Sequence, residues 1–395
     1  MHLVCLLAAV LSAEPADEGA ATLPSPDAGV PAAEDKFQAE VTAKFGEGVT
    51  FKSGDVKLNL RGRVQVQALF VFPTEGSAAV RQNAIFVRRA RLAIKGEFPW
   101  HLSMNLQLAF ANLDMEPDAP NVLRDFNVQW APLRDLSFRL GQMKVPFDVQ
   151  RVVSSSAQQF VDRSTVTGEL NLDRDVGLVV FSEDLFGLGG RLRYALGVFG
   201  GDGRNRIGTN VGLLYGGRVR YSPLGPFDDR LEGDPDRDPK FRLAFGAAAA
   251  RNIATNRPRS TTGTPYRFAN FDYTHAAGDV HVKWHGLSLL SEIYWRQADT
   301  DSVTQGALTE FSRSGWGWFT QVGGYLTPWL ELAARYGDTQ PLGATDPTFT
   351  RVREVGGTIN LMFLKHDLKL QTDLFWLDEA GKGRLQLRIQ AQVYF

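Results

Sequence analysis

Apolar and polar residues alternate along most of the chain from about residue 55 onward. The clearest case is the C-terminal segment, where every second residue from Leu385 to Phe395 is apolar and most residues between them are polar. Segments 56–70 and 102–110 repeat the pattern. A period of two predicts β-strands that have one apolar and one polar face.

The alternating segments are long. Several reach ten residues or more, whereas strands of soluble β-sandwiches usually have about 5–6 residues. Tilted strands of about 9–11 residues cross a bilayer, and we count about sixteen of them, an even number as bacterial barrels require. The sequence therefore predicts an all-β fold, a transmembrane antiparallel β-barrel over residues 55–395.

The connections between these segments alternate in length. Short turns, such as those around Pro99, Pro132 and Pro328, alternate with longer polar stretches near residues 74–82, 112–121, 143–173, 200–208, 252–265, 298–311 and 338–350. Bacterial outer-membrane barrels have short periplasmic turns and longer outer loops. The acidic stretch 223–240 breaks this rule, and the sequence explains it only as an enlarged periplasmic turn.

Aromatic residues lie near the expected strand ends. Membrane barrels carry girdles of aromatic side chains at both interfaces. We predict such girdles from seven residues: Trp100, Trp130, Trp284, Trp329, Trp376, Tyr394 and Phe395.

The N-terminal part differs from the rest of the chain. The short apolar run Leu3–Leu11 is followed by small residues, which predicts a signal peptide over residues 1–13. Residues 14–54 are predicted to be a disordered linker and a short N-terminal segment, because Glu14–Asp35 is rich in Ala, Pro, Asp and Glu. The only cysteine, Cys5, lies in the predicted signal peptide, so no disulfide or thiolate metal site is expected.

The predicted barrel is mildly cationic. The chain has 43 basic and 44 acidic residues, but residues 1–35 hold six acids and no Lys or Arg, which leaves about +5 for the remainder. Arginine offers fixed hydrogen-bond donors for anions and stays charged. The basic residues on the polar faces of the strands therefore predict an arginine-lined pore. The basic residues in phase with the polar faces are Arg61, Arg63, Arg89, Arg91, Lys95, Arg139, Arg191, Arg193, Arg218, Arg220, Arg384 and Arg388.

Signs of enzyme chemistry are missing from the sequence. His275, His281 and His285 cluster in one hairpin without a serine nucleophile motif nearby. We find no glycine-rich phosphate loop, paired-carboxylate motif or metal-ligand spacing, and Asp228–Asp238 lacks the spacing of a calcium loop. We expect no catalytic residue, no metal, no cofactor and no nucleic-acid partner.

Several segments resemble the phosphate-selective porin O and P family. They are Gly62–Gln65, Phe86–Gly96, Gly141–Phe147, Arg151–Ser155, Phe160–Arg163 and Asp173–Gly177, together with the terminal aromatic Phe395. The resemblance covers roughly residues 56–180 in motifs and the rest in architecture only.

This resemblance implies a sixteen-stranded homotrimeric barrel in the outer membrane of a Gram-negative bacterium. It implies that the third loop, near Met143–Asp173, bends inward to narrow the pore, and that Phe395 is read by the barrel-assembly machinery. Arg151 stands where the family has Lys, and Arg91 stands where a phosphate-specific member has Tyr, so strict phosphate selectivity does not carry over. The residues expected at the constriction are Arg63, Arg88, Arg89, Arg91, Asp125, Arg151, Ser154, Ser155 and Arg163.

We therefore expect passive diffusion of small anions, with phosphate or polyphosphate first. The alternatives are a general porin of weak anion preference, for example for organic acids, and a non-conducting structural barrel. Lumen arginines could also serve only to pair with Asp or Glu across the barrel.

At two places the alternation leaves open which side chain faces the lumen. Strict alternation puts Arg88 on the lipid face, at a cost of about 2–4 kcal/mol near the bilayer midplane. A β-bulge, a rim position or a trimer interface would resolve this. Arg124 and Asp125 leave open by one residue which of them faces the anion.

Overall fold

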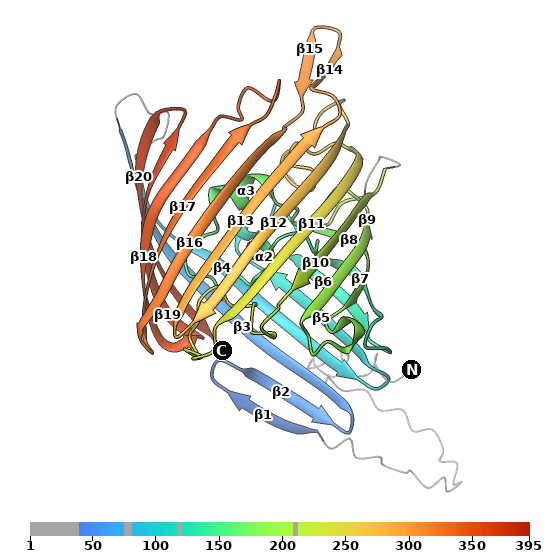
Figure 1. The fold of residues 1–395 in the computed structure, drawn as a ribbon, viewed down its shortest axis with the longest axis vertical. Helices are drawn as coiled ribbons and strands as arrows, with labels where there is room; N and C mark the ends of the chain where they lie inside the picture. The colour runs from blue at the N-terminus through green and yellow to red at the C-terminus, as the bar shows by residue number, and fades with distance from the viewer. Residues whose placement is uncertain (1–38, 75–80, 117–119, 208–211) are drawn as a thin grey trace, which may run out of the picture. The chain divides into compact units, whose positions relative to one another are not determined.

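The computed structural model describes residues 39–74, 81–116, 120–207 and 212–395, and its main feature is a closed barrel of sixteen antiparallel strands (Figure 1). The strand β20 pairs with β3, from Arg384 opposite Pro73 to Tyr394 opposite Arg63, which closes the sheet. The predicted all-β barrel is confirmed. Its strands are β3 (Val56–Pro73), β4 (Gln82–Phe98), β5 (Leu102–Ala109), β6 (Leu123–Trp130), β7 (Ser137–Lys144), β8 (Arg174–Ser182), β9 (Leu192–Phe199), β10 (Leu214–Tyr221), β11 (Arg242–Thr255), β12 (Phe271–Trp284), β13 (Leu287–Ala298), β16 (Gly315–Thr327), β17 (Leu330–Pro341), β18 (Val352–His366), β19 (Leu368–Glu379) and β20 (Lys382–Tyr394).

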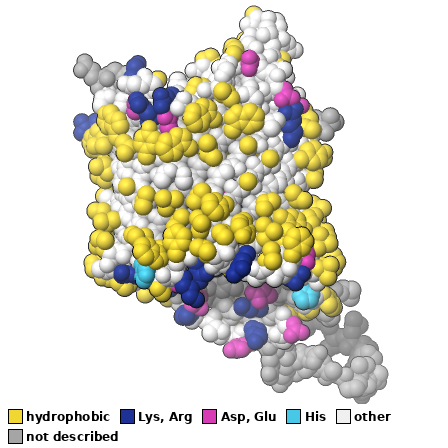
Figure 2. Space-filling view, viewed as in Figure 1, with side chains coloured by type: hydrophobic (Ala, Val, Ile, Leu, Met, Phe, Trp, Pro, Cys, Tyr) yellow, Lys and Arg dark blue, Asp and Glu magenta, His cyan; other side chains and the backbone are white. Residues whose placement is uncertain are grey.

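The two faces of the strands have the composition that the alternation predicts. Leu140, Ile293 and Val355 are half or more exposed on the outside, whereas Gln65 and Gln390 are fully buried inside. Figure 2 shows apolar side chains over the outer face, with the visible charged side chains gathered near its two rims. Among the helices of the described residues, none is long and apolar enough to cross a membrane.

The aromatic residues follow the prediction with one exception. Trp100, Trp130, Trp284 and Trp329 are exposed near strand ends, as interfacial girdles require. Tyr394 was wrongly assigned to a girdle, because its hydroxyl donates to Ser156 Oγ at 3.0 Å inside the barrel. Its position on the polar face of the last strand explains this orientation.

A small hairpin precedes the barrel. It consists of β1 (Glu40–Lys44) and β2 (Gly48–Ser53), and β2 pairs with the start of β3 from Val49 opposite Leu60 to Ser53 opposite Val56. These strands fall in residues 14–54, for which a disordered linker and a short N-terminal segment were predicted. The predicted signal peptide and residues 14–38 of the predicted linker lie outside the described residues.

The wall of the barrel differs in height around its circumference. The strands β5–β10 have 8 or 9 residues, whereas β11 and the later barrel strands have 12 to 15. At ~3.3 Å per residue and a tilt of ~40°, eight residues rise about 20 Å and thirteen about 33 Å. We call β5–β10 the short wall.

The third loop, residues 145–173, carries two short helices, α2 (Val149–Val152) and α3 (Thr165–Leu170). Its Gln150 donates to Gln321 on β16 at 3.1 Å, and its Val161 N–H donates to Asp373 on β19 at 3.0 Å. Since these partners are buried polar side chains of the inner face, far from β7 and β8 in strand order, the contacts place this segment inside the barrel.

A second connection reaches the same region from the other rim. Residues 222–241, which we call the long turn, join β10 to β11. Within it, Glu232 accepts the Gln159 N–H at 2.8 Å and donates its own N–H to the Ala157 carbonyl at 3.3 Å. Asp234 accepts the Gly286 N–H at 2.7 Å. The acidic stretch is therefore more than an enlarged turn, because it contacts the third loop.

Candidate functional site

Two capped helices give the third loop its local shape. Asp148 accepts the Arg151 N–H at 2.6 Å at the start of α2, and Ser164 accepts the Thr167 N–H at 3.0 Å at the start of α3. Asp and Ser satisfy the free N–H groups at helix starts. The sequence thus fixes both turns locally and leaves Ser154 and Ser155 between them.

Four of the predicted site residues contact one another here: Arg63, Arg91, Ser154 and Ser155. Arg63 donates to Ser155 Oγ at 3.0 Å and lies 3.5 Å from Ser154 Oγ, and Arg91 donates to Ser155 Oγ at 3.1 Å. Both arginines project from neighbouring strands, where Arg63 stands opposite Arg91 in the pairing of β3 with β4. Ser154 and Ser155 are therefore held by these contacts.

The facing of Arg88 is resolved by a β-bulge. Gln65 pairs with Arg89 and the next residue, Val66, pairs with Val87, so Arg88 is an extra residue in β4. Such a bulge re-aims the side chain. Arg88 and Arg89 both contact Asp162 of the third loop, at 3.3 and 3.0 Å. A bulge was one of the three open alternatives for Arg88.

A second β-bulge determines which way the side chains of Arg124 and Asp125 face. Gln107 pairs with Asp125 while Leu108 pairs with Leu123, so Arg124 is the extra residue of β6. Both side chains are buried in the lumen. Arg124 lies 2.9 Å from Asp114, and Asp125 accepts from Arg174 at 2.9 Å.

Arg151 and Arg163 hold the third loop itself. Arg151 pairs with Asp173, with Nε donating at 2.8 Å. Arg163 donates to the carbonyls of Gln150 and Val153, both at 2.8 Å, which lie at or just beyond the end of α2. A cation at a helix C-terminus satisfies its free carbonyls, so both residues have a positioning role.

In the ion-pair network connected to the predicted site residues, arginines outnumber carboxylates. Seven arginines (Arg88, Arg89, Arg91, Arg124, Arg151, Arg174 and Arg388) share five aspartates (Asp114, Asp125, Asp162, Asp173 and Asp373). Within the described part of the chain, Arg63 and Arg163 have no carboxylate partner. We call these residues, with Ser154 and Ser155, the loop cluster; its formal charge is nine positive against five negative.

The pKa of the Asp162 carboxyl reflects the excess of positive charge in the loop cluster. Burial raises the pKa of the Asp162 carboxyl, but Arg88, Arg89 and Arg388 lower it further, and the net pKa lies well below its usual range. Asp162 is therefore ionised at neutral pH.

Most carboxylate partners of these arginines were not among the residues predicted from the sequence. Asp114 comes from the connection between β5 and β6, Asp162 and Asp173 from the third loop, and Asp373 from β19. A single sequence contains no signal for such pairing between distant segments. In the described ranges, we find no group of three His, Cys, Asp or Glu side chains that could hold a metal ion.

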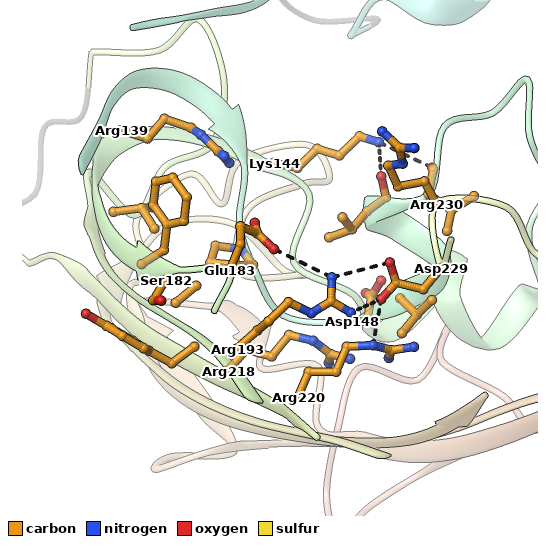
Figure 3. Close-up of a pocket in the computed structure, with 18 of the residues that line it drawn as sticks. Arg139, Lys144, Asp148, Ser182, Glu183, Arg193, Arg218, Arg220, Asp229 and Arg230 are labelled. Atoms are coloured by element: carbon orange, nitrogen blue, oxygen red, sulfur yellow. Dashed lines mark hydrogen bonds and ion pairs between the residues drawn. The ribbon is translucent and has the colours of Figure 1, made fainter. Parts of the chain in front are cut away.

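A cavity of about 680 Å³ lies between the third loop, the long turn and the inner wall of β7–β10. We call it the lower pocket. In Figure 3, Arg139 and Lys144 lie along one side of it and Arg193, Arg218 and Arg220 along the other. Glu183 and Asp229 are ion-paired with Arg193.

Comparison with known proteins agrees with this architecture. The family model described as phosphate-selective porin O and P matches residues 58–316. None of the curated proteins compared with the chain matches it.

Among solved structures, the chain is similar to the outer membrane channel DcaP of Acinetobacter baumannii, with a TM-score of 0.60 and 12% identity over 88% of this chain and 100% of that one. The anion-selective porin from Comamonas acidovorans has a TM-score of 0.54 and 14% identity, covering 86% and 100%. The trimer form of in-vitro folded OmpT of Vibrio cholerae has a TM-score of 0.53 and 12% identity, covering 86% of this chain and 99% of that one. These likenesses support the fold.

The match to the family model spans well over half of the chain, and the barrel has the architecture of porins. Porins are channels of the outer membrane of Gram-negative bacteria, not enzymes. The chain belongs to the phosphate-selective porin O and P family.

Proposed function

We propose that the protein conducts small anions by passive diffusion through a pore lined by the arginines of the loop cluster. The charge excess of that cluster is the observation that carries the proposal. An anion that loses hydration water in a narrow passage needs replacement donors, and conduction needs several moderate sites in place of one deep well.

Phosphate or polyphosphate is the first candidate. Guanidinium groups bind phosphate oxygens in bidentate geometry, and Arg63 lies beside Ser154 and Ser155, whose hydroxyls are neutral donors. Weak anion preference is the second candidate, because ion pairs neutralise most of the other arginines of the cluster.

Planar-bilayer recording tests the proposal. A potassium chloride gradient should give a reversal potential that shows chloride preference, and inorganic phosphate should block the chloride current. Cation preference would overturn the proposal, whereas chloride preference without phosphate block would favour the general porin. A barrel that does not conduct after reconstitution would favour the structural scaffold.

We propose that three copies associate through the short wall. Its strands rise about 20 Å, less than the ~25 Å apolar band of such barrels. Its outer face nevertheless exposes Leu140, Leu196 and Val219, and contact with neighbouring subunits would cover them. Sedimentation of the detergent-solubilised protein should give a mass of three chains, and a monomer would contradict this.

The last residue, Phe395, is proposed as the signal for the barrel-assembly machinery. It exchanges two backbone hydrogen bonds with Gly62, at 3.0 and 2.8 Å, and its side chain is 57% exposed. Replacing Phe395 with Ala should reduce the amount of folded barrel in the outer membrane while leaving refolding in detergent intact. Equal amounts in the membrane would contradict the proposal.

A further inference from the structure

The wall of the lower pocket carries an apolar strip where a water-filled pore would have polar residues. Leu178–Phe181 are four consecutive apolar residues, so alternation fails in β8 and both faces become apolar. Val179 and Phe181 point inward, and Phe181 stands opposite Ala195 of β9. Val152 of the third loop lines the same space and is 45% exposed. The pocket is therefore open and partly apolar.

Two cations beside this strip have no carboxylate partner in the described part of the chain. Arg139 donates only to Gln129, at 2.9 and 3.3 Å, and its guanidinium lies 4.8 Å from the centre of the Phe181 ring. Lys144 donates to the carbonyls of Val152 and Val153, at 2.6 and 3.3 Å. Stacking on an aromatic ring fixes the guanidinium plane. Arg139 thus keeps charge available for a ligand, whereas the Lys144 amine is held by two carbonyls of the third loop.

The arginines on the opposite side are in a different state. Arg218 and Arg220 pair with Asp279, at 2.5 and 2.8 Å, and Arg220 also contacts Asp229 of the long turn at 2.7 Å. Arg193 pairs with Asp229 and Glu183. These ion pairs largely neutralise that side, so an incoming anion is attracted most strongly toward Arg139.

We propose that the lower pocket is a second anion-binding site, selective for organic anions with an apolar ring, of which benzoate is the simplest example. The carboxylate is held by Arg139 beside Phe181, and the ring lies against Phe181 and Val152. Pockets of 300–1,000 Å³ with apolar walls and a few polar groups suit small organic ligands, and this cavity has about 680 Å³. Inorganic phosphate cannot use the apolar strip.

The experiment is block of the chloride current through the full-length protein in planar bilayers. We expect benzoate to reach half-block at a concentration about tenfold lower than acetate, because one buried ring adds apolar contact. Benzyl alcohol, which has the ring without the charge, should not block. Equal half-block by benzoate and acetate would overturn the proposal.

Variants separate the two halves of the site. Phe181→Thr should raise the benzoate half-block concentration about fivefold and leave acetate unchanged, whereas Arg139→Gln should raise both about tenfold. Arg384→Gln removes a lumen arginine that pairs with Glu379 at the other end of the barrel and should change neither. If Phe181→Thr does not fold, Val152→Thr at the exposed position replaces it, with about a threefold shift expected. Unchanged benzoate block in the folded ring-contact variant would overturn the proposal.

This inference rests on the proposed anion conduction only in requiring that anions reach the lumen. Calorimetric titration of benzoate into the detergent-solubilised protein measures the site without conduction. A cation-selective reversal potential together with benzoate binding that Arg139→Gln abolishes would sink the proposed function and keep the pocket. Chloride selectivity without calorimetric binding of benzoate would do the opposite.

Discussion

The loop cluster and the lower pocket are both rich in arginine, yet their cations are in different situations. In the loop cluster, Arg89 and Arg91 are buried and paired with aspartates, and Arg63 is packed against Ser155. In the lower pocket, Arg139 and Lys144 have no carboxylate partner among the described residues and lie beside a cavity. An arginine count alone therefore does not locate a binding site: pairing and free volume decide whether the charge holds the fold together or meets a solute.

The largest effect should come from breaking the ion pairs of the loop cluster. Arg174 is buried and pairs with both Asp125 and Asp173 at 2.9 Å. Arg174→Ala leaves two carboxylates without this partner in the interior, and removing one member of a buried pair costs about 3–5 kcal/mol. Urea unfolding followed by tryptophan fluorescence in lipid vesicles measures this loss.

Arg353→Ala is the matched control for that variant. Arg353 pairs with Asp378, but its side chain is 47% exposed, and exposed pairs contribute about 1 kcal/mol or less. Equal destabilisation by the two variants would show that the ion pairs of the loop cluster do not hold the barrel together.

The next largest effect should follow from removing the long turn, which contacts both the third loop and the lower pocket. Replacing residues 226–238 of the long turn with a short Gly-Ser turn removes Glu232, which contacts the third loop at Ala157 and Gln159, and Asp229, which contacts Arg193 and Arg220. We expect about a twofold rise in single-channel conductance, since the segment occupies the lumen. Unchanged conductance would mean that the long turn lies outside the path of the ions.

A smaller, opposed pair of effects should distinguish the two regions directly. Arg63→Gln should reduce the chloride-to-potassium permeability ratio about threefold, because it removes a lumen charge with no carboxylate partner among the described residues. It should leave benzoate block intact. Arg139→Gln should instead raise the benzoate half-block concentration about tenfold, and equal benzoate block in the two variants would remove the distinction between the loop cluster and the lower pocket.

The smallest effect concerns pH. Burial raises the pKa of the Asp148 carboxyl to about 6, although Arg218, Arg151 and Arg163 oppose this shift. Asp148 lines the lower pocket, so as the pH falls through 6 the pocket loses a negative charge and gains affinity for anions. Block by benzenesulfonate should therefore strengthen about twofold between pH 7.5 and 5.5.

The variant Asp148→Asn separates the pH effect of Asp148 from that of other titrating groups. One such group is Glu292, which accepts the first N–H groups of α2. Asn also serves as a helix cap. The variant should bind at pH 7.5 as tightly as the unmodified protein does at pH 5.5. A pH dependence that persists in Asp148→Asn would assign it to another group.

The alternation of residues was enough to predict the barrel, because lipid outside and water inside impose a period of two on most of its strands. The same rule failed at Arg88 and Arg124, where one inserted residue shifts the register without any mark in the composition. Tyr394 was assigned to the interface because it is an aromatic residue at a strand end, although alternation puts it on the polar face of the last strand. The nine expected constriction residues do gather around the third loop, but their partners Asp114, Asp162 and Asp173 depend on tertiary contacts that local patterns do not encode.

The pairing of β3 with β20 has a consequence for the order of folding. It joins residues about as far apart in the chain as any that meet, such as Arg63 and Tyr394, whereas most other neighbours in the barrel are consecutive strands. Contacts of such long range form late, because the entropy of closing the chain must be overcome first. Until then, β3 and β20 both present unpaired backbone edges, which are prone to association with other chains. The rate of barrel closure, and not the strength of any single contact, should therefore set the protein's exposure to aggregation.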